Sequence, residues 1–162
     1  MASRNKILAL FCFCAICALP VFSSAALPFV GVSLKPSPAV GPYQDDNFLE
    51  KANETISAFS NQTIPNGTDL LEIQSTQQQL AKMKISPEFY LVASEINAFL
   101  YYTGKAGGAY ADALSMTASN NIPKSQGNSQ IAEANTYYTA ATETWDQIKD
   151  MYPNVTLYTM PK

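Results

Sequence analysis

Acidic side chains outnumber basic ones in this sequence, 13 to 10, and are the first groups to consider for chemistry. Glu143, Asp146 and Asp150 recur at spacings of three and four residues, which places them on one side of a helix. Carboxylate oxygens in such a row could bind a divalent cation. The three acids lie opposite the apolar side of the same segment, however, and this placement favours an acidic face in contact with water.

Two further acids, Glu88 and Glu95, are candidates for two-carboxylate glycosidase chemistry. That reaction needs two carboxyl groups that face each other across a cleft. Glu88 falls in the first turn of a predicted helix, and Glu95 lies away from the apolar face of that helix. Both are interpreted as structural. Asp45-Asp46 is interpreted as a helix cap, because the stretch lacks the spacing of a calcium loop.

Histidine and cysteine set stronger limits on the chemistry. The chain has no histidine, and its three cysteines are Cys12, Cys14 and Cys17, all close to the N-terminus. Zinc and haem ligation, histidine-based catalytic triads and Glu-x-x-His di-iron sites all need residue types that the rest of the chain lacks. We therefore expect no catalytic residue, no metal and no cofactor, and we predict that the protein is not an enzyme.

Residues 101–110, YYTGKAGGAY, place three glycines in an otherwise apolar helical pattern. A phosphate-binding loop is excluded, because the Gly-Lys pair is followed by alanine and no buried strand precedes it. At about 100° per residue, Ile96, Gly107 and Leu114 fall within about 20° of one another, so the apolar face keeps its phase across the glycines. This favours close helix packing over the alternative, a kink or break. The residues predicted to make the helix contact are Gly104, Gly107, Gly108, Tyr138 and Trp145.

Helical spacing of apolar residues predicts four helices, of which the third and fourth are the long ones. Ser86 and Pro87 suit the start of the third, and Pro153 ends the fourth. Only residues 29–34 and 155–159 have the composition of strands. The predicted fold class is all-α, an antiparallel bundle of about four helices with short extended segments at the N- and C-termini. The helices are expected to begin at Asp45 or Asp46 and at residues 70, 86 and 129, and to end near residues 59, 84, 119 and 152.

The N-terminus has the anatomy of a secretory signal. Arg4 and Lys6 precede an apolar run that is short for a membrane span of about 20 residues, and small residues follow it. We expect cleavage after residue 25 or 26 and a mature chain that is secreted or at the cell surface with no membrane span; an uncleaved anchor is the alternative. The predicted organisation is a signal peptide at 1–25, a proline-rich extended segment at 26–42, the helical bundle at 43–152 and an extended tail at 153–162.

Removal of the signal leaves an acidic chain. Loss of Arg4 and Lys6 leaves eight of the 10 basic residues, all lysines, against 13 acidic residues, which is a formal net charge of about −5. An arginine-free surface of this sign repels phosphate backbones. Nucleic acid is therefore excluded as a partner.

Asparagine and tyrosine supply the remaining candidates. Four Asn-x-Thr sequons are candidates for glycosylation, although asparagine and threonine are also common cap and loop residues. Exposed members of the nine tyrosines could stack on sugars or anchor a protein partner, although tyrosine at helical spacing more often fills the edge of a bundle. The sequons are at Asn53, Asn61, Asn66 and Asn154.

The expected function is a secreted or cell-surface helical bundle with a non-catalytic binding or assembly role. Its partner would be a protein or another cell-surface molecule. The alternative is an extracellular small-molecule binding or sensing bundle, with a ligand site between the long helices.

Overall fold

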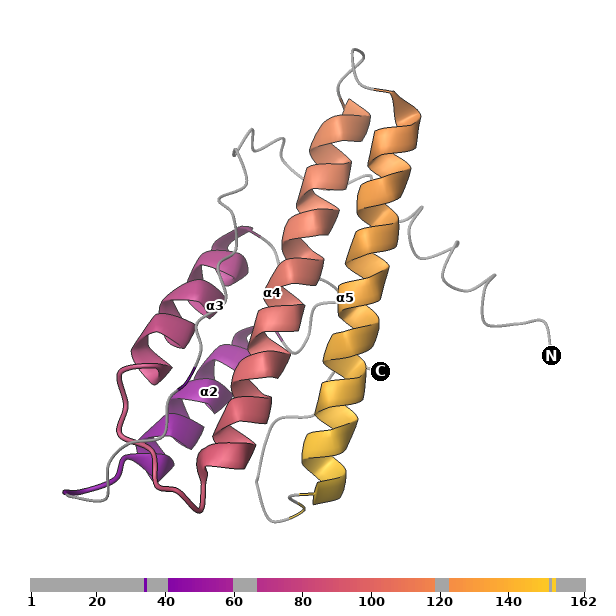
Figure 1. The fold of residues 1–162 in the computed structure, drawn as a ribbon. Coiled ribbons are helices and arrows are strands. Elements are labelled where there is room, and N and C mark those ends of the chain that lie inside the picture. Colours follow the sequence, from indigo (N-terminus) through magenta and orange to yellow (C-terminus); the bar gives the residue numbers. More distant parts are fainter. Residues whose placement is uncertain (1–33, 35–40, 60–66, 119–122, 152, 154–162) are drawn as a thin grey trace.

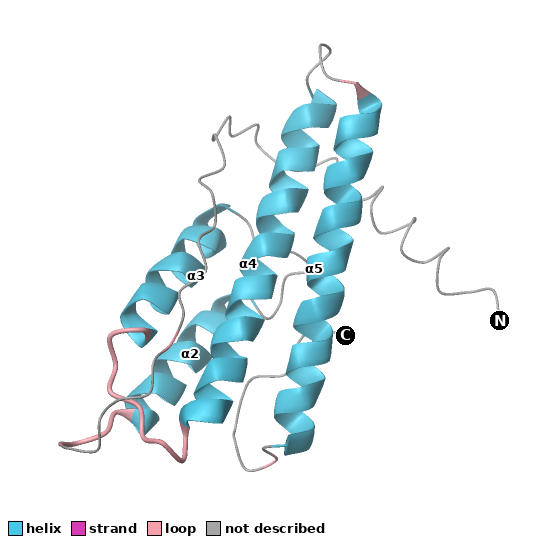
Figure 2. Ribbon diagram, viewed as in Figure 1, coloured by secondary structure: helices cyan, strands magenta, loops and turns pink. Residues whose placement is uncertain are grey.

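In the computed structural model, the residues described are 34, 41–59, 67–118, 123–151 and 153. They form four α-helices, and no strand occurs among these residues (Figure 1, Figure 2). The prediction of an all-α bundle of about four helices is confirmed. The helices are α2 (Asp45–Phe59), α3 (Gly67–Leu80), α4 (Tyr90–Ala118) and α5 (Lys124–Met151).

Consecutive helices run in opposite directions, and α4 lies between α3 and α5 (Figure 1). The start of α2 is bonded to the connection between α3 and α4. The backbone N–H of Gln44 donates to the Lys84 carbonyl oxygen at 2.8 Å, and the Lys84 N–H donates to Gln44 Oε1 at 3.0 Å. The Ser86 N–H donates to Asp45 Oδ1 at 3.0 Å. These bonds bring the first turn of α2, the end of α3 and the start of α4 to one end of the bundle.

The start of α4 has the cap that the sequence predicts. Ser86 Oγ accepts a hydrogen bond from the Phe89 N–H at 3.1 Å, and the regular helix begins at the next residue, Tyr90. From there α4 continues through its three glycines to Ala118 without interruption. A break at the glycines, which was the alternative to close packing, does not occur.

Four helix boundaries differ from the sequence prediction by three or more residues. Helix α3 begins at Gly67, ahead of the expected start at residue 70, and α4 begins at Tyr90, after the expected start at residue 86. Helix α3 ends at Leu80, ahead of the expected end at residue 84, because the backbone of Lys84 bonds to Gln44 instead of extending the helix. Helix α5 begins at Lys124, ahead of the expected start at residue 129. Residues 124–128 are polar and include a glycine, so apolar spacing did not mark them as helical. Gly127 lies close to Ala113 and Thr117 of α4.

The large apolar side chains gather in one half of the α4–α5 pair. We call residues 90–100 of α4, residues 141–151 of α5 and the helices α2 and α3 the core half. We call residues 101–118 of α4 and 124–140 of α5 the distal half; its far end extends beyond α2 and α3 (Figure 1). The central core cluster comes entirely from the core half, the α3–α4 connection and Leu34, and its largest members are Phe48, Ile56, Ile73, Leu80, Ile85, Ile96, Phe99, Leu100, Trp145 and Ile148.

Leu34 is the one residue before Gly41 that the structure describes, and it belongs to this core. Its side chain is buried, and its carbonyl oxygen accepts a hydrogen bond from the Tyr90 hydroxyl at 3.4 Å. The remainder of the segments predicted to be extended, residues 29–33 and 155–159, lies outside the described residues. Among the residues described, no helix is long and apolar enough to cross a membrane.

Candidate interaction surface

The acids singled out in the sequence do not assemble into a site. Glu143, Asp146 and Asp150 are exposed on α5, and Asp146 forms an ion pair with Lys149 at 2.8 Å. Glu88 is exposed in the turn before α4. Across the part of the chain that the structure describes, no three acidic, histidine or cysteine side chains are grouped so that they could hold a metal ion. The described acids thus form solvated faces and helix starts.

Helix α4 has different neighbours on its two sides. The Phe99 ring packs against Trp145 of α5 with 4.7 Å between ring centroids. The Asn97 side chain and backbone both accept hydrogen bonds from Gln77 Nε2 of α3, each at 3.0 Å. Because Asn97 and Phe99 are two positions apart, their directions on the helix differ by about 200°, so α3 and α5 lie on nearly opposite sides of α4.

This geometry places the α4 glycines away from α5. Gly104 and Gly108 fall within about 20° of the direction of Asn97, on the α3 side, and Gly107 lies between the two sides. Gly104 and Gly107 are buried, whereas a Cβ built on Gly108 would meet no atom within 4 Å. The close contact predicted at Gly108 is therefore absent. At about 100° per residue, the three glycines do not point towards Trp145 of α5.

Sequence reasoning missed the glycine that does lie at a close α4–α5 approach. A Cβ on Gly127 would be 3.1 Å from Thr117 Cγ2 and 3.8 Å from the Ala113 carbonyl oxygen. The signal was present in the heptad spacing of α5, because Gly127 lies one heptad before the buried Ala134. The buried series of α5 that includes Ala134, Ala141, Trp145 and Ile148 thus extends back to Gly127.

The distal half buries small side chains and leaves its aromatic rings nearer the surface. Tyr110 and Tyr137 are half-buried, and Tyr138, predicted to lie in the helix contact, is 43% exposed. Tyr138 lies level with the small residues of α4, and these residues do not enclose its ring. Apart from Thr103, the buried residues of the described distal half are Gly104, Ala106, Gly107, Ala109, Ala113, Gly127 and Ala134.

Two aromatic rings and one lysine lie close together on α4, and all three are half-buried. The Tyr101 and Tyr102 rings are 5.5 Å apart, and Lys105 Nζ lies over the Tyr101 ring at 5.8 Å from its centroid. Further along the helix, burial and then the Glu133 carboxylate on α5 raise the pKa of Asp112 above its usual value of 3.8. The distal half thus carries two acids near each other across the helix pair.

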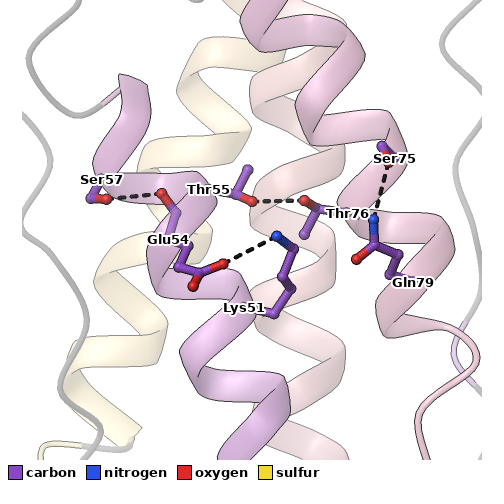
Figure 3. Close-up of polar contacts among 7 residues, drawn as sticks. All are labelled: Lys51, Glu54, Thr55, Ser57, Ser75, Thr76 and Gln79. Atoms are coloured by element: carbon purple, nitrogen blue, oxygen red, sulfur yellow. Dashed lines mark hydrogen bonds and ion pairs between the residues drawn. The ribbon is translucent and has the colours of Figure 1, made fainter.

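Buried hydrogen bonds, which the sequence did not reveal, join α2 to α3 and α3 to α4. Thr55 Oγ1 of α2 and Thr76 Oγ1 of α3 are 2.7 Å apart and fully enclosed (Figure 3). Gln77, which interrupts the apolar side of α3 in the sequence, is buried by its bonds to Asn97. A buried polar residue needs such a partner, and that partner lies on another helix, so the pairing is invisible in a local pattern.

One of the four predicted glycosylation sequons falls within the described residues. Asn53 lies inside α2 with its Oδ1 atom buried, and the Thr55 of the same sequon is fully buried. The other three, at Asn61, Asn66 and Asn154, lie outside the described residues. Comparisons of the chain with known protein families, with curated proteins and with solved structures found no match.

Proposed function

We propose that the protein is a secreted or cell-surface helical bundle with a non-catalytic binding or assembly role, acting through the distal half of the α4–α5 pair. The observation that carries this proposal is the distribution of side chains along that pair. The core half holds the large buried side chains, whereas the distal half adds length, small buried residues and accessible tyrosines. A half that contributes little to burial is well suited to present a surface to a partner.

The accessible tyrosines supply the contact chemistry of this surface. Tyrosine and tryptophan are enriched among residues that dominate protein–protein binding, because a rigid ring buries a large area at low entropic cost. Tyr138 is the most exposed ring of the described distal half, and Tyr110 and Tyr137 are half-buried. The partner we propose is a protein or another cell-surface molecule, and the sequons outside α2 are the proposed glycosylation sites.

Secretion is tested by expressing the full chain in a host with a secretory pathway and measuring the intact mass of the product. We expect protein in the medium that begins at Ala26 or Leu27. Membrane-bound protein that retains Met1 would contradict the proposal.

Binding is tested by placing a photo-crosslinking amino acid at Tyr138, with Leu91 as the matched control. Leu91 is 65% exposed but belongs to the core half. On the cells that secrete the chain, we expect a specific crosslinked product from position 138 and none from position 91. Equal crosslinking at the two positions would show that the distal half has no special role.

A second candidate function, small-molecule binding, is favoured by one buried atom. Thr103 is 7% exposed, and its Oγ1 has no hydrogen-bond partner within the described structure. A ligand that reached this hydroxyl would satisfy it. Ligand screening by thermal shift would support this function if a compound stabilised the wild type and not Thr103→Val, and would count against it if both proteins responded alike.

A further inference from the structure

Thr103 is a buried polar residue without a partner, and it lies on the side of α4 that faces α5. The residue is 7% exposed, and its Oγ1 makes no hydrogen bond within the part of the chain that the structure describes. At about 100° per residue, Thr103 is about 40° from Phe99, whose ring packs on Trp145 of α5. Because a buried hydroxyl without a partner costs free energy, the Thr103 hydroxyl requires an explanation.

The residue opposite Thr103 follows from the register of the two helices. The Phe99–Trp145 contact and the close approach of α4 at Gly127 fit one antiparallel register, in which one step forward on α4 matches one step back on α5. In this register, Thr103 lies level with Ala141. On each helix, the Phe99–Trp145 pair is four residues away, which is about 6 Å.

The side chains next to Thr103 along this contact are small and uncharged. Ala141 and Ala106, one turn further along α4, are both buried. The aromatic pair lies at one end of this stretch, and Tyr138, which is level with Ala106, lies at the other. We call Thr103, Ala106 and Ala141 the Thr103 seam. None of these three buried residues is ionisable.

We propose that the Thr103 seam binds a small, uncharged, planar aromatic molecule that carries one hydrogen-bond acceptor. The hydroxyl hydrogen of Thr103 lacks an acceptor, so the ligand supplies one. A flat ring stacks on the neighbouring aromatic side chains and requires little separation of the two helices. A charged ligand is disfavoured, because it would be desolvated without a counter-charge.

The ligand enters by separation of α4 and α5 at the boundary of the distal half. Small side chains close the contact there and bury little apolar area, so opening costs less than it would beside the large side chains of the core half. A ligand that binds the open form then makes it the dominant one. The inference rests on small-molecule binding, the second candidate function, and names the class of ligand for it.

Nuclear magnetic resonance of the full mature chain tests the site through Trp145, the only tryptophan of the chain. In isotope-labelled protein, its indole N–H gives a single resonance that reports on the adjoining Thr103 seam. We expect coumarin, an uncharged bicyclic ring with a carbonyl acceptor, to shift this resonance saturably with a dissociation constant of about 1 mM or lower. Free indole, which donates a hydrogen bond but has no acceptor, should bind about fivefold more weakly. Coumarin-3-carboxylate, which is charged, should not bind.

Variants of two equally buried threonines make the test specific. Thr103→Val keeps the shape and removes the hydroxyl, so it should weaken coumarin binding by about fivefold or more, whereas Thr103→Ser keeps the hydroxyl and should bind within about threefold of wild type. Thr144 is the matched control, because it is also 7% exposed but its hydroxyl already donates to the Ala140 carbonyl oxygen at 2.8 Å. Thr144→Val should bind coumarin as the wild type does.

The proposal is overturned if coumarin causes no saturable shift, if coumarin and indole bind wild type equally well, or if Thr103→Val binds coumarin no more weakly than Thr144→Val. Thermal unfolding of each variant separates loss of binding from loss of fold, and the comparison of probes on the wild type needs no variant. If these probes fail but a compound of another class stabilises the wild type and not Thr103→Val, the ligand class is wrong and small-molecule binding stands.

Discussion

The core half and the distal half are built on the same two helices but packed with different side chains. In the core half, Phe99 and Trp145 meet at 4.7 Å within a cluster that also includes residues of α2 and α3. Burial of one large apolar side chain contributes about 1.5–3 kcal/mol. In the distal half, alanine and glycine form the seam and bury little apolar area. The comparison teaches that large buried side chains are concentrated in one half of the α4–α5 pair, and the binding role that we propose belongs to the other half.

The largest expected effect comes from truncating a side chain of the core half. Phe99→Ala should lower the free energy of unfolding by about 3–5 kcal/mol, because it removes a fully buried ring and leaves a cavity. Tyr138→Ala in the distal half should cost less than about 1 kcal/mol. Urea unfolding measures both, and comparable losses would contradict the division into two halves.

Replacing two buried threonines by valine should change the stability of the protein in opposite directions. Thr55→Val should cost about 1–3 kcal/mol, because it leaves the Thr76 hydroxyl buried without its partner, and Thr55→Val/Thr76→Val should recover most of the loss. Thr103→Val should instead be neutral or stabilising, since that hydroxyl has no partner in the described structure. Thermal unfolding distinguishes the two signs, and a loss at position 103 as large as that at position 55 would show that Thr103 is satisfied.

Two glycines test how closely the helices of the distal half approach each other. Gly108→Ala should stabilise the monomer by about 1 kcal/mol, because the new methyl group meets open space and alanine is the better helix former. Gly127→Ala should gain less or lose stability, since its methyl group would come within 3.1 Å of Thr117 Cγ2. Equal gains in urea midpoint at low protein concentration would mean that α5 does not approach α4 closely at Gly127.

The smallest expected effect is a pH dependence in the distal half. Because the folded-state pKa of Asp112 is raised, its ionisation opposes folding, and this loss of stability sets in as pH rises above the usual value of 3.8. Asp112→Asn should therefore stabilise the monomer at pH 7, with no gain below about pH 3.8. Glu133→Gln, which removes the neighbouring charge, should reproduce part of the gain. A pH-independent difference between wild type and Asp112→Asn would refute the electrostatic explanation.

The sequence predicted those features of the fold that depend on local signals. The Ser86 cap and the long helices α4 and α5 follow from residue types and apolar spacing alone. The buried polar pairs could not be predicted in this way. In the sequence, Gln77 only interrupts an apolar pattern, because its partner Asn97 lies on another helix. For the same reason, the sequence could not show which side of α4 its glycines face. Phase fixes the angles between residues on one helix, but only contacts such as Phe99–Trp145 locate the neighbouring helices.

Native-state hydrogen exchange along α4 and α5 tests the division into two halves most directly. Amides in residues 94–100 and 142–149 should exchange only through global unfolding, because the central cluster encloses these segments. Amides in residues 108–117 and 130–138 should open at lower free energy, because small residues form their seam. The measurement is made at a protein concentration low enough to keep the chain monomeric. A graded loss of protection from the core half to the distal half is the predicted result, and equal protection along both helices would contradict the account.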